Sequence, residues 1–262
     1  MFRSISFLLM VFFIYCSTVP ITGRRQLNII PTQTLLSMSL QEYQSFMQSN
    51  RVSTNQSQQN MVRQVGGRLQ AAVERYFREN KMGGELKNFR WEFNLVENSE
   101  VNAWCMPGGK VVVYTGILSL TEDETGLAVV MGHEIAHAVA KHGNERMSQG
   151  LLTQLGGMAL EVALQSKPQE TRQLWMAAFG LGAQVGMLLP FSRLHEYEAD
   201  ELGTIFMAMA SYNPQRAISF WEKMSQLGGS NPPEFISTHP SDSKRVANLK
   251  KMMPKIQKYY RP

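Results

Sequence analysis

Cysteine is scarce in this chain of 262 residues, which contains only Cys16 and Cys105. A fold held together by several disulfide bonds, as in small secreted domains, is therefore excluded. The fold must depend on its hydrophobic core, and we expect Cys105 to pack there as a small apolar residue. The length and the 44% hydrophobic content suffice for one sizeable domain or two small ones.

A run of basic residues is also absent. The 26 Lys and Arg residues are scattered among 21 Asp and Glu residues, which gives a net charge of +5. This pattern is typical of a solvated basic surface and gives little support for a nucleic-acid partner. We therefore expect no nucleic acid among the partners.

No apolar run is long enough to span a bilayer comfortably. The first fifteen residues, MFRSISFLLMVFFIY, carry Arg3 and then an apolar stretch of the length found in signal peptides. Cys16 comes directly after it, where bacterial lipoprotein signals are cleaved and acylated. We predict a signal peptide over 1–15 and lipidation of Cys16. Because Ile14 and Tyr15 are larger than the residues usual before such a cysteine, an ordinary export signal or a retained anchor is the alternative.

The remaining chain divides into a linker and a domain. Residues 16–60 lack sustained periodicity and are expected to form a lipid-anchor tether and linker, with a short helix near 34–48. Apolar residues at helical spacing predict an amphipathic helix over 62–76. Alternation over 89–95 and a β-branched stretch over 108–116 predict a small sheet. The chain beyond this sheet is predicted to be mostly helical.

Two segments of this helical part have distinctive patterns. Thr121 with Glu124 three residues later is a capping-box pattern, and it predicts the start of a helix that ends near Gly143. Residues 150–190 are apolar and rich in glycine. The run over 175–191 is slightly short for a membrane span, so we expect it to pack as a buried helix or to cover a site.

The stretch GHEIAH places His133 and His137 four residues apart, with Glu134 directly after the first. On a helix both imidazoles can point at one metal ion, and Glu134 can take a proton from a water on that metal. This is the HExxH arrangement of zinc peptidases, in which three protein ligands leave one position open. Two histidines that are merely satisfied in the core are the alternative, but burying such polarity without a partner is costly.

The third ligand is expected on a later helix. In FSRLHEYEADELG, Glu196 and Asp200 are four residues apart and share a face. Glu196 is the candidate ligand, and Asp200 would accept a hydrogen bond from the second nitrogen of a ligating histidine. Glu198 and His195 are rival ligands that point in other directions around the helix.

Two further histidines are candidates. His142 lies near the expected end of the HExxH helix and is predicted to stabilise its C-terminus. His239 precedes a proline in STHPSDSKR, with Arg245 six residues later as a supporting residue of the site. His239 is predicted either to stabilise the oxyanion or to occupy the open zinc position and hold the enzyme inactive.

Four stretches in this order, NAWCMPGGKVVVYTGIL, GHEIAHAVAKHG, SRLHEYEADELG and STHPSDSKR, resemble the motifs of the family forty-eight zinc metallopeptidases. That family includes HtpX, the CAAX prenyl proteases and BepA, and the resemblance covers roughly residues 60–255. It implies a zincin-like (gluzincin) α+β fold, mostly helical with a small sheet, and an edge strand after residues 102–109 that binds substrate backbone. The site residues that it implies are His133, His137 and Glu196 on one Zn²⁺, Glu134 as general base and Asp200 beside them.

The function implied is that of a zinc-dependent endopeptidase over residues 61–262. We expect a periplasmic lipoprotein of the small exported branch that is anchored at the outer membrane, with the outer side of the inner membrane as the alternative. Its expected partners are polypeptide substrates, such as misfolded or unassembled envelope proteins, and the membrane through the lipid anchor. The alternative is an envelope chaperone or assembly factor whose protease site is regulated or silent.

Overall fold

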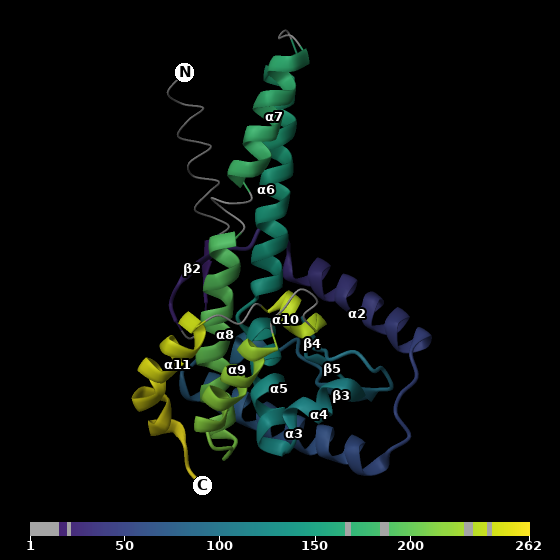
Figure 1. Cartoon of the computed structure of the whole chain (residues 1–262), viewed down its shortest axis with the longest axis vertical. Coiled ribbons are helices and arrows are strands. Elements are labelled where there is room, and N and C mark those ends of the chain that lie inside the picture. The colour runs from purple at the N-terminus through teal and green to yellow at the C-terminus, as the bar shows by residue number, and fades with distance from the viewer. Residues whose placement is uncertain (1–15, 20–21, 166–168, 184–188, 228–232, 240–242) are drawn as a thin grey trace. The chain divides into compact units, whose positions relative to one another are not determined.

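The computed structural model describes residues 16–19, 22–165, 169–183, 189–227, 233–239 and 243–262 (Figure 1). Two compact units divide the chain. One combines Met1–Thr34 with Lys141–His195, and the other combines Leu35–Ala140 with Glu196–Pro262. We call them the smaller and the larger unit. The predicted signal peptide over 1–15 lies outside the described residues.

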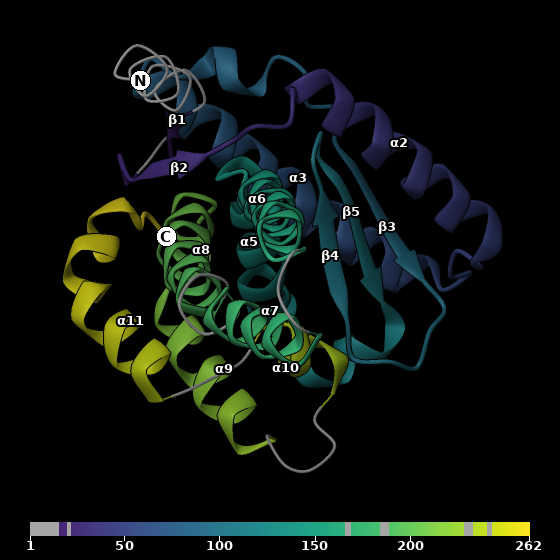
Figure 2. The same ribbon diagram turned by 90° about the horizontal axis from the view of Figure 1, so that it is seen from above.

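The larger unit contains a three-stranded sheet of β3 (Glu92–Val96), β4 (Ala103–Met106) and β5 (Lys110–Tyr114). The strand order is β3-β5-β4, with β3 parallel and β4 antiparallel to β5 (Figure 2). Every residue of β5 is buried, as its central position and β-branched sequence require. β4 forms an edge of the sheet and packs against the helix that carries HExxH.

Helix α3 (Gln56–Glu79) confirms the predicted amphipathic helix. Asn55 caps its N-terminus by accepting a hydrogen bond from the backbone N–H of Gln58. The buried face carries aliphatic and aromatic side chains that pack on β3 and on α5. The predicted helix near 34–48 is also present, as α2 (Thr32–Ser49).

Helix α5 (Glu124–Val139) begins differently from the prediction. Its N-cap is Asp123, whose carboxylate accepts a hydrogen bond from Gly126 N at 2.7 Å. The capping box of Thr121 and Glu124 was wrong because the backbone turns at Glu122, which has a φ of 68° and separates α5 from the short α4 (Leu118–Thr121). α5 is buried around most of its circumference, so its polar residues must find partners inside the protein.

The C-terminal part of the chain is helical, as predicted. It contains α8 (Leu189–Met209), α9 (Gln215–Gln226), α10 (Glu234–Thr238) and α11 (Ser243–Ile256). α9 packs against α5 and against α11. The mostly helical architecture with a small sheet confirms the expected fold class.

The smaller unit contains two short antiparallel strands, β1 (Cys16–Thr18) and β2 (Arg25–Leu27), and the helices α6 (His142–Ala163) and α7 (Gln169–Ala183). His142 therefore begins α6, and the prediction that it stabilises the C-terminus of the HExxH helix was wrong. α5 ends earlier because Lys141 adopts a left-handed conformation with a φ of 59°. The His142 ring instead stacks on His195, with the ring centroids 4.4 Å apart.

A buried ion-pair network joins the start of α6 to two other segments of the smaller unit. Glu145 accepts hydrogen bonds from both terminal nitrogens of Arg24, at 2.9 and 2.7 Å, and its Oε2 lies 2.8 Å from Nε2 of His195. Burial raises the pKa of Glu145, but His195 and Arg24 outweigh burial and lower it to about 2. Part of the stretch expected as a tether is thus fixed to α6. In the described part of the chain, no helix is both long and apolar enough to cross a membrane.

Candidate metal centre

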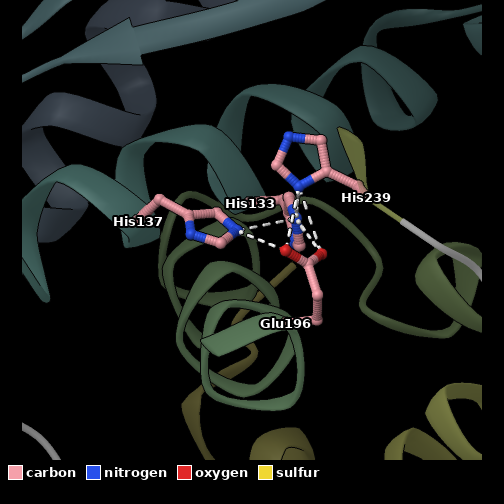
Figure 3. A group of neighbouring side chains, drawn as sticks. All are labelled: His133, His137, Glu196 and His239. Carbon is pink, nitrogen blue, oxygen red and sulfur yellow. Dashed lines mark hydrogen bonds and ion pairs between the residues drawn. The ribbon is translucent and has the colours of Figure 1, made fainter. Parts of the chain in front are cut away.

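Four side chains from three segments of the larger unit converge on one point (Figure 3). α5 supplies His133 and His137, α8 supplies Glu196, and His239 comes directly after the last residue of α10. Each offers a ligand atom, and these atoms lie within 4.8 Å of one another. Three of the four residues come from the predicted ligand set, and His239 is the fourth.

The geometry of this group fits a metal ion. Nε2 of His133 lies 3.1 Å from Nε2 of His137 and 3.2 Å from a carboxylate oxygen of Glu196. His137 Nε2 lies 3.4 Å from the other oxygen. Imidazole nitrogens and a carboxylate that meet at one point are the donor set that zinc prefers. The residues present therefore fit Zn²⁺.

The pKa of His133 reflects the charges around it. Burial lowers this pKa, but Asp200 and Glu196 outweigh burial and raise it to about 9. The pKa of Glu196 is raised by burial and lowered much more by the three histidines, so it lies well below its usual value. A site that attracts protons this strongly also attracts a cation, and metal binding there should release protons.

A close approach of two backbones brings the ligand-bearing helices together. A Cβ atom at Gly203 would lie 2.7 Å from the backbone carbon of Gly132, and one at Gly132 would lie 2.9 Å from the oxygen of Gly203. Only glycine at both positions lets α5 and α8 cross here without displacement. Gly132 directly precedes His133, so this crossing helps to place Glu196 beside the two histidines. The pair was not predicted from the sequence because nothing local marks two distant glycines as neighbours.

Glu134 lies beside the four ligand candidates. It is 4% exposed, and one of its oxygens lies 3.4 Å from Nε2 of His239. Burial raises its pKa above the usual value for a glutamate. Glu134 is not one of the four residues whose ligand atoms form this group.

Asp200 and Arg245 support the ligand group, since Asp200 contacts His133 and Arg245 contacts both Asp200 and Glu196. Asp200 Oδ1 lies 3.1 Å from Nδ1 of His133, on the ring edge opposite the ligand atom. Arg245 donates two hydrogen bonds to the Asp200 carboxylate, at 2.8 and 2.7 Å, and a third to the backbone oxygen of His239 at 3.1 Å. Arg245 is 1% exposed. This single guanidinium therefore connects the carboxylate behind His133 with the segment that carries His239.

Comparison with known proteins gives the family. The profile of Peptidase family M48 matches residues 63–253, which is most of the chain. The chain belongs to peptidase family M48. Its members are zinc metallopeptidases, so the expected family, enzyme class and cofactor are confirmed.

Three relatives illustrate the breadth of the M48 family. The mitochondrial metalloendopeptidase OMA1 of Schizosaccharomyces pombe is 29% identical over 259 residues, which cover 94% of this chain and 69% of the relative. Human mitochondrial metalloendopeptidase OMA1 is 30% identical over 256 residues, covering 94% of this chain and 48% of the relative. The beta-barrel assembly-enhancing protease of Escherichia coli is 29% identical over 166 residues, covering 61% and 34%. The chain thus spans from about a third to about two thirds of the length of these relatives.

Two stacked aromatic side chains, Trp221 and Phe235, lie against the His133 ring of this M48 site, and this contact was not predicted from the sequence. The ring of Trp221 lies 5.1 Å from the His133 ring and stacks on Phe235 at 6.0 Å, between centroids. The Arg245 guanidinium lies 3.8 Å above Trp221. Such a cation–π contact fixes the guanidinium plane. Helical spacing marks Trp221 only as a core residue, so its place under the ligands becomes visible only in three dimensions.

The rival residues named from the sequence take other places. His195 contacts Glu145 in the smaller unit, and neither His142 nor Glu198 belongs to the ligand group among the described residues. Cys105 lies on the edge strand β4 and is partly exposed. The contact with Glu145 thus accounts for the burial of His195, which does not act as a ligand in this group.

Proposed function

We propose that the chain is an endopeptidase in which His133, His137 and Glu196 hold Zn²⁺ and Glu134 acts as general base. The observation that carries the proposal is the convergence of these three donors from α5 and α8, with a buried carboxylate next to them. When bound, zinc supplies a Lewis acid that polarises the scissile carbonyl and makes water more acidic. Glu134 then accepts a proton from the attacking water and delivers it to the leaving amine. Its raised pKa suits a group that must first take up and later release a proton.

His239 has two possible roles, and the geometry favours one of them. Its Nδ1 lies 3.1 Å from both carboxylate oxygens of Glu196 and 3.3 Å from Nε2 of His133. This nitrogen therefore points at the position of the metal rather than away from it, as an oxyanion donor would. We propose that His239 fills the fourth position in a resting form and that substrate displaces it.

Replacing His239 by alanine tests this role. His239→Ala should raise the initial rate of casein cleavage, because the position that a substrate carbonyl needs is no longer occupied. The measurement compares initial rates at equal zinc content, with Ser237→Ala, on the short helix that precedes His239, as a control. A fall of about a hundredfold would instead assign His239 to the oxyanion.

The compartment of the enzyme and its substrates are the subject of a second proposal. The apolar start of the sequence with Cys16 directly after it supports an exported, lipid-anchored protein, and the relative named as a beta-barrel assembly-enhancing protease supports a role in quality control of envelope proteins. Other relatives carry mitochondrial names, so resemblance alone does not fix the compartment. We propose a periplasmic lipoprotein that acts on misfolded or unassembled envelope proteins.

The catalytic proposal can be tested by removing the metal. The purified full chain should contain about one zinc ion, and a chelator should abolish its cleavage of casein. Added Zn²⁺ should restore cleavage, because the four donors are held in place by the protein. Cleavage that persists after complete zinc removal would contradict the proposal.

A further inference from the structure

A row of aliphatic side chains lies exposed along one face of α6, in the smaller unit. Its members recur at spacings of three or four residues, so they share one side of the helix. They are Met147 (39% exposed), Leu151 (38%), Leu155 (50%), Met158 (56%) and Val162 (63%). We call them the apolar row. It extends over four helical turns, about 22 Å.

The neighbouring helix covers a different side of α6. α6 and α7 lie side by side, and the ring of Phe179 on α7 packs against Gly156 and Gly157 (Figure 1). A Cβ atom at Gly156 would lie 3.1 Å from that ring, so the two glycines permit a close contact. They are about half a turn away from the apolar row around the helix. α7 therefore leaves the row exposed, and an exposed patch of this kind is typical of an interaction surface.

Charge indicates the kind of partner. The smaller unit contains eight Lys and Arg residues and three Glu residues, so it carries the whole net charge of +5 while the larger unit is neutral. No charged residue lies between Arg146 and Glu161 on α6. An apolar face within a basic unit suits an anionic lipid surface. A second copy of the same face would instead bring two sets of positive charge together.

The N-terminal part of the chain points to the same partner. The apolar stretch that ends at Tyr15 leads directly into β1, and β1 pairs with β2. β2 packs on α6, and the hydrogen bonds from Arg24 to Glu145 fix this segment to the start of the helix. The apolar stretch and Cys16 both belong to the smaller unit, which also carries the apolar row. A membrane attachment through either of them would therefore be part of the same unit as the row.

We propose that α6 lies in the headgroup region of an anionic bilayer, with the apolar row directed toward the acyl chains. This would be a second membrane contact, separate from any anchor at the N-terminus and independent of the catalytic site. The uncharged segment of α6 is too short to span a bilayer, which needs about 20 residues. A helix that lies in the interface, with the basic residues Lys141 and Arg146 at its start, is consistent with this length and with the apolar row.

Photo-crosslinking of the full chain tests this proposal and identifies the occupant directly. A benzophenone amino acid replaces Leu155 in the apolar row or, as the matched control, Ala71, an exposed residue of α3 in the larger unit. Each protein is bound to vesicles of phosphatidylglycerol with phosphatidylethanolamine and irradiated, with and without added casein. Mass spectrometry detects adducts, and thermal melting monitored by circular dichroism checks that both variants are folded.

We expect phospholipid adducts at position 155 and at least about tenfold fewer at position 71. Adducts at 155 should also decrease when the vesicles contain only zwitterionic lipid, because the basic unit is then less attracted. Absence of lipid adducts at 155 in vesicle-bound protein would overturn the proposal. So would equal adducts at both positions, a covalent dimer formed through position 155, or preferential crosslinking of 155 to casein.

Discussion

Glu134→Gln should reduce peptide hydrolysis by about a thousandfold or more while leaving zinc bound. Glutamine has nearly the same shape as glutamate but cannot accept the proton of the attacking water. The four donors that meet at the metal position do not include Glu134, so the ligand group stays complete. The variant should also remain folded, because glutamine fills nearly the same volume and can keep the contact with His239, whose Nε2 lies 3.4 Å from a Glu134 oxygen.

The measurement pairs zinc content per chain with the initial rate of casein cleavage. Glu124→Gln is a suitable control, since Glu124 lies on the same helix and is partly exposed at its first turn. We expect about one zinc ion in the parent and in both variants, with cleavage lost only in Glu134→Gln. Near-normal cleavage by Glu134→Gln would remove Glu134 from the mechanism.

The same variant separates the endopeptidase from the alternative function as a chaperone or assembly factor. A cell that lacks the protein is complemented with the parent or with Glu134→Gln. Failure of the variant to complement is expected if hydrolysis is the physiological activity. Full rescue by a protein that binds zinc but does not cleave would favour the chaperone function.

The convergence of most of the candidate ligands was predictable because they come from two local patterns. His133 and His137 are one helical turn apart, and so are Glu196 and Asp200, and a four-residue spacing on a helix fixes a shared face without knowledge of the fold. The placement of His239 near the site was supported by the family resemblance. The orientation of its Nδ1 toward the other ligands depends on the tertiary structure and could not be inferred from residue spacing.

The features that the sequence did not reveal depend on contacts between distant segments. The crossing of Gly132 and Gly203 and the stacking of Arg245 on Trp221 join helices that are remote in the sequence. The misplaced helix boundaries have a related cause. Glu122 and Lys141 adopt positive φ values, which ordinary propensities do not predict for these residue types. Such a turn separates α5 from its neighbour at each end and moves His142 to the start of a new helix.

Glu196→Ala should lose most of its zinc affinity together with hydrolysis. The carboxylate provides the negative charge of the ligand group, and without it the positive Arg245 guanidinium, 3.2 Å from a Glu196 oxygen, also opposes a cation at this position. Removal of a group that only orients a ligand already costs about 10- to 100-fold in metal affinity, so removal of the ligand itself should cost more. Competition with a chelator of known affinity measures the loss.

His239 complicates this experiment in a way that the structure makes testable. Three imidazoles remain after Glu196→Ala, and three histidines are a known zinc ligand set, so His239 can retain part of the zinc. The double variant Glu196→Ala with His239→Ala leaves two imidazoles and should bind no zinc at stoichiometric concentration. Glu201→Ala, on the same helix and paired with Lys255, is the control that should bind normally. Zinc retained by the folded double variant would place the third ligand elsewhere, whereas its stepwise loss would establish Glu196 as a ligand and His239 as the donor that replaces it.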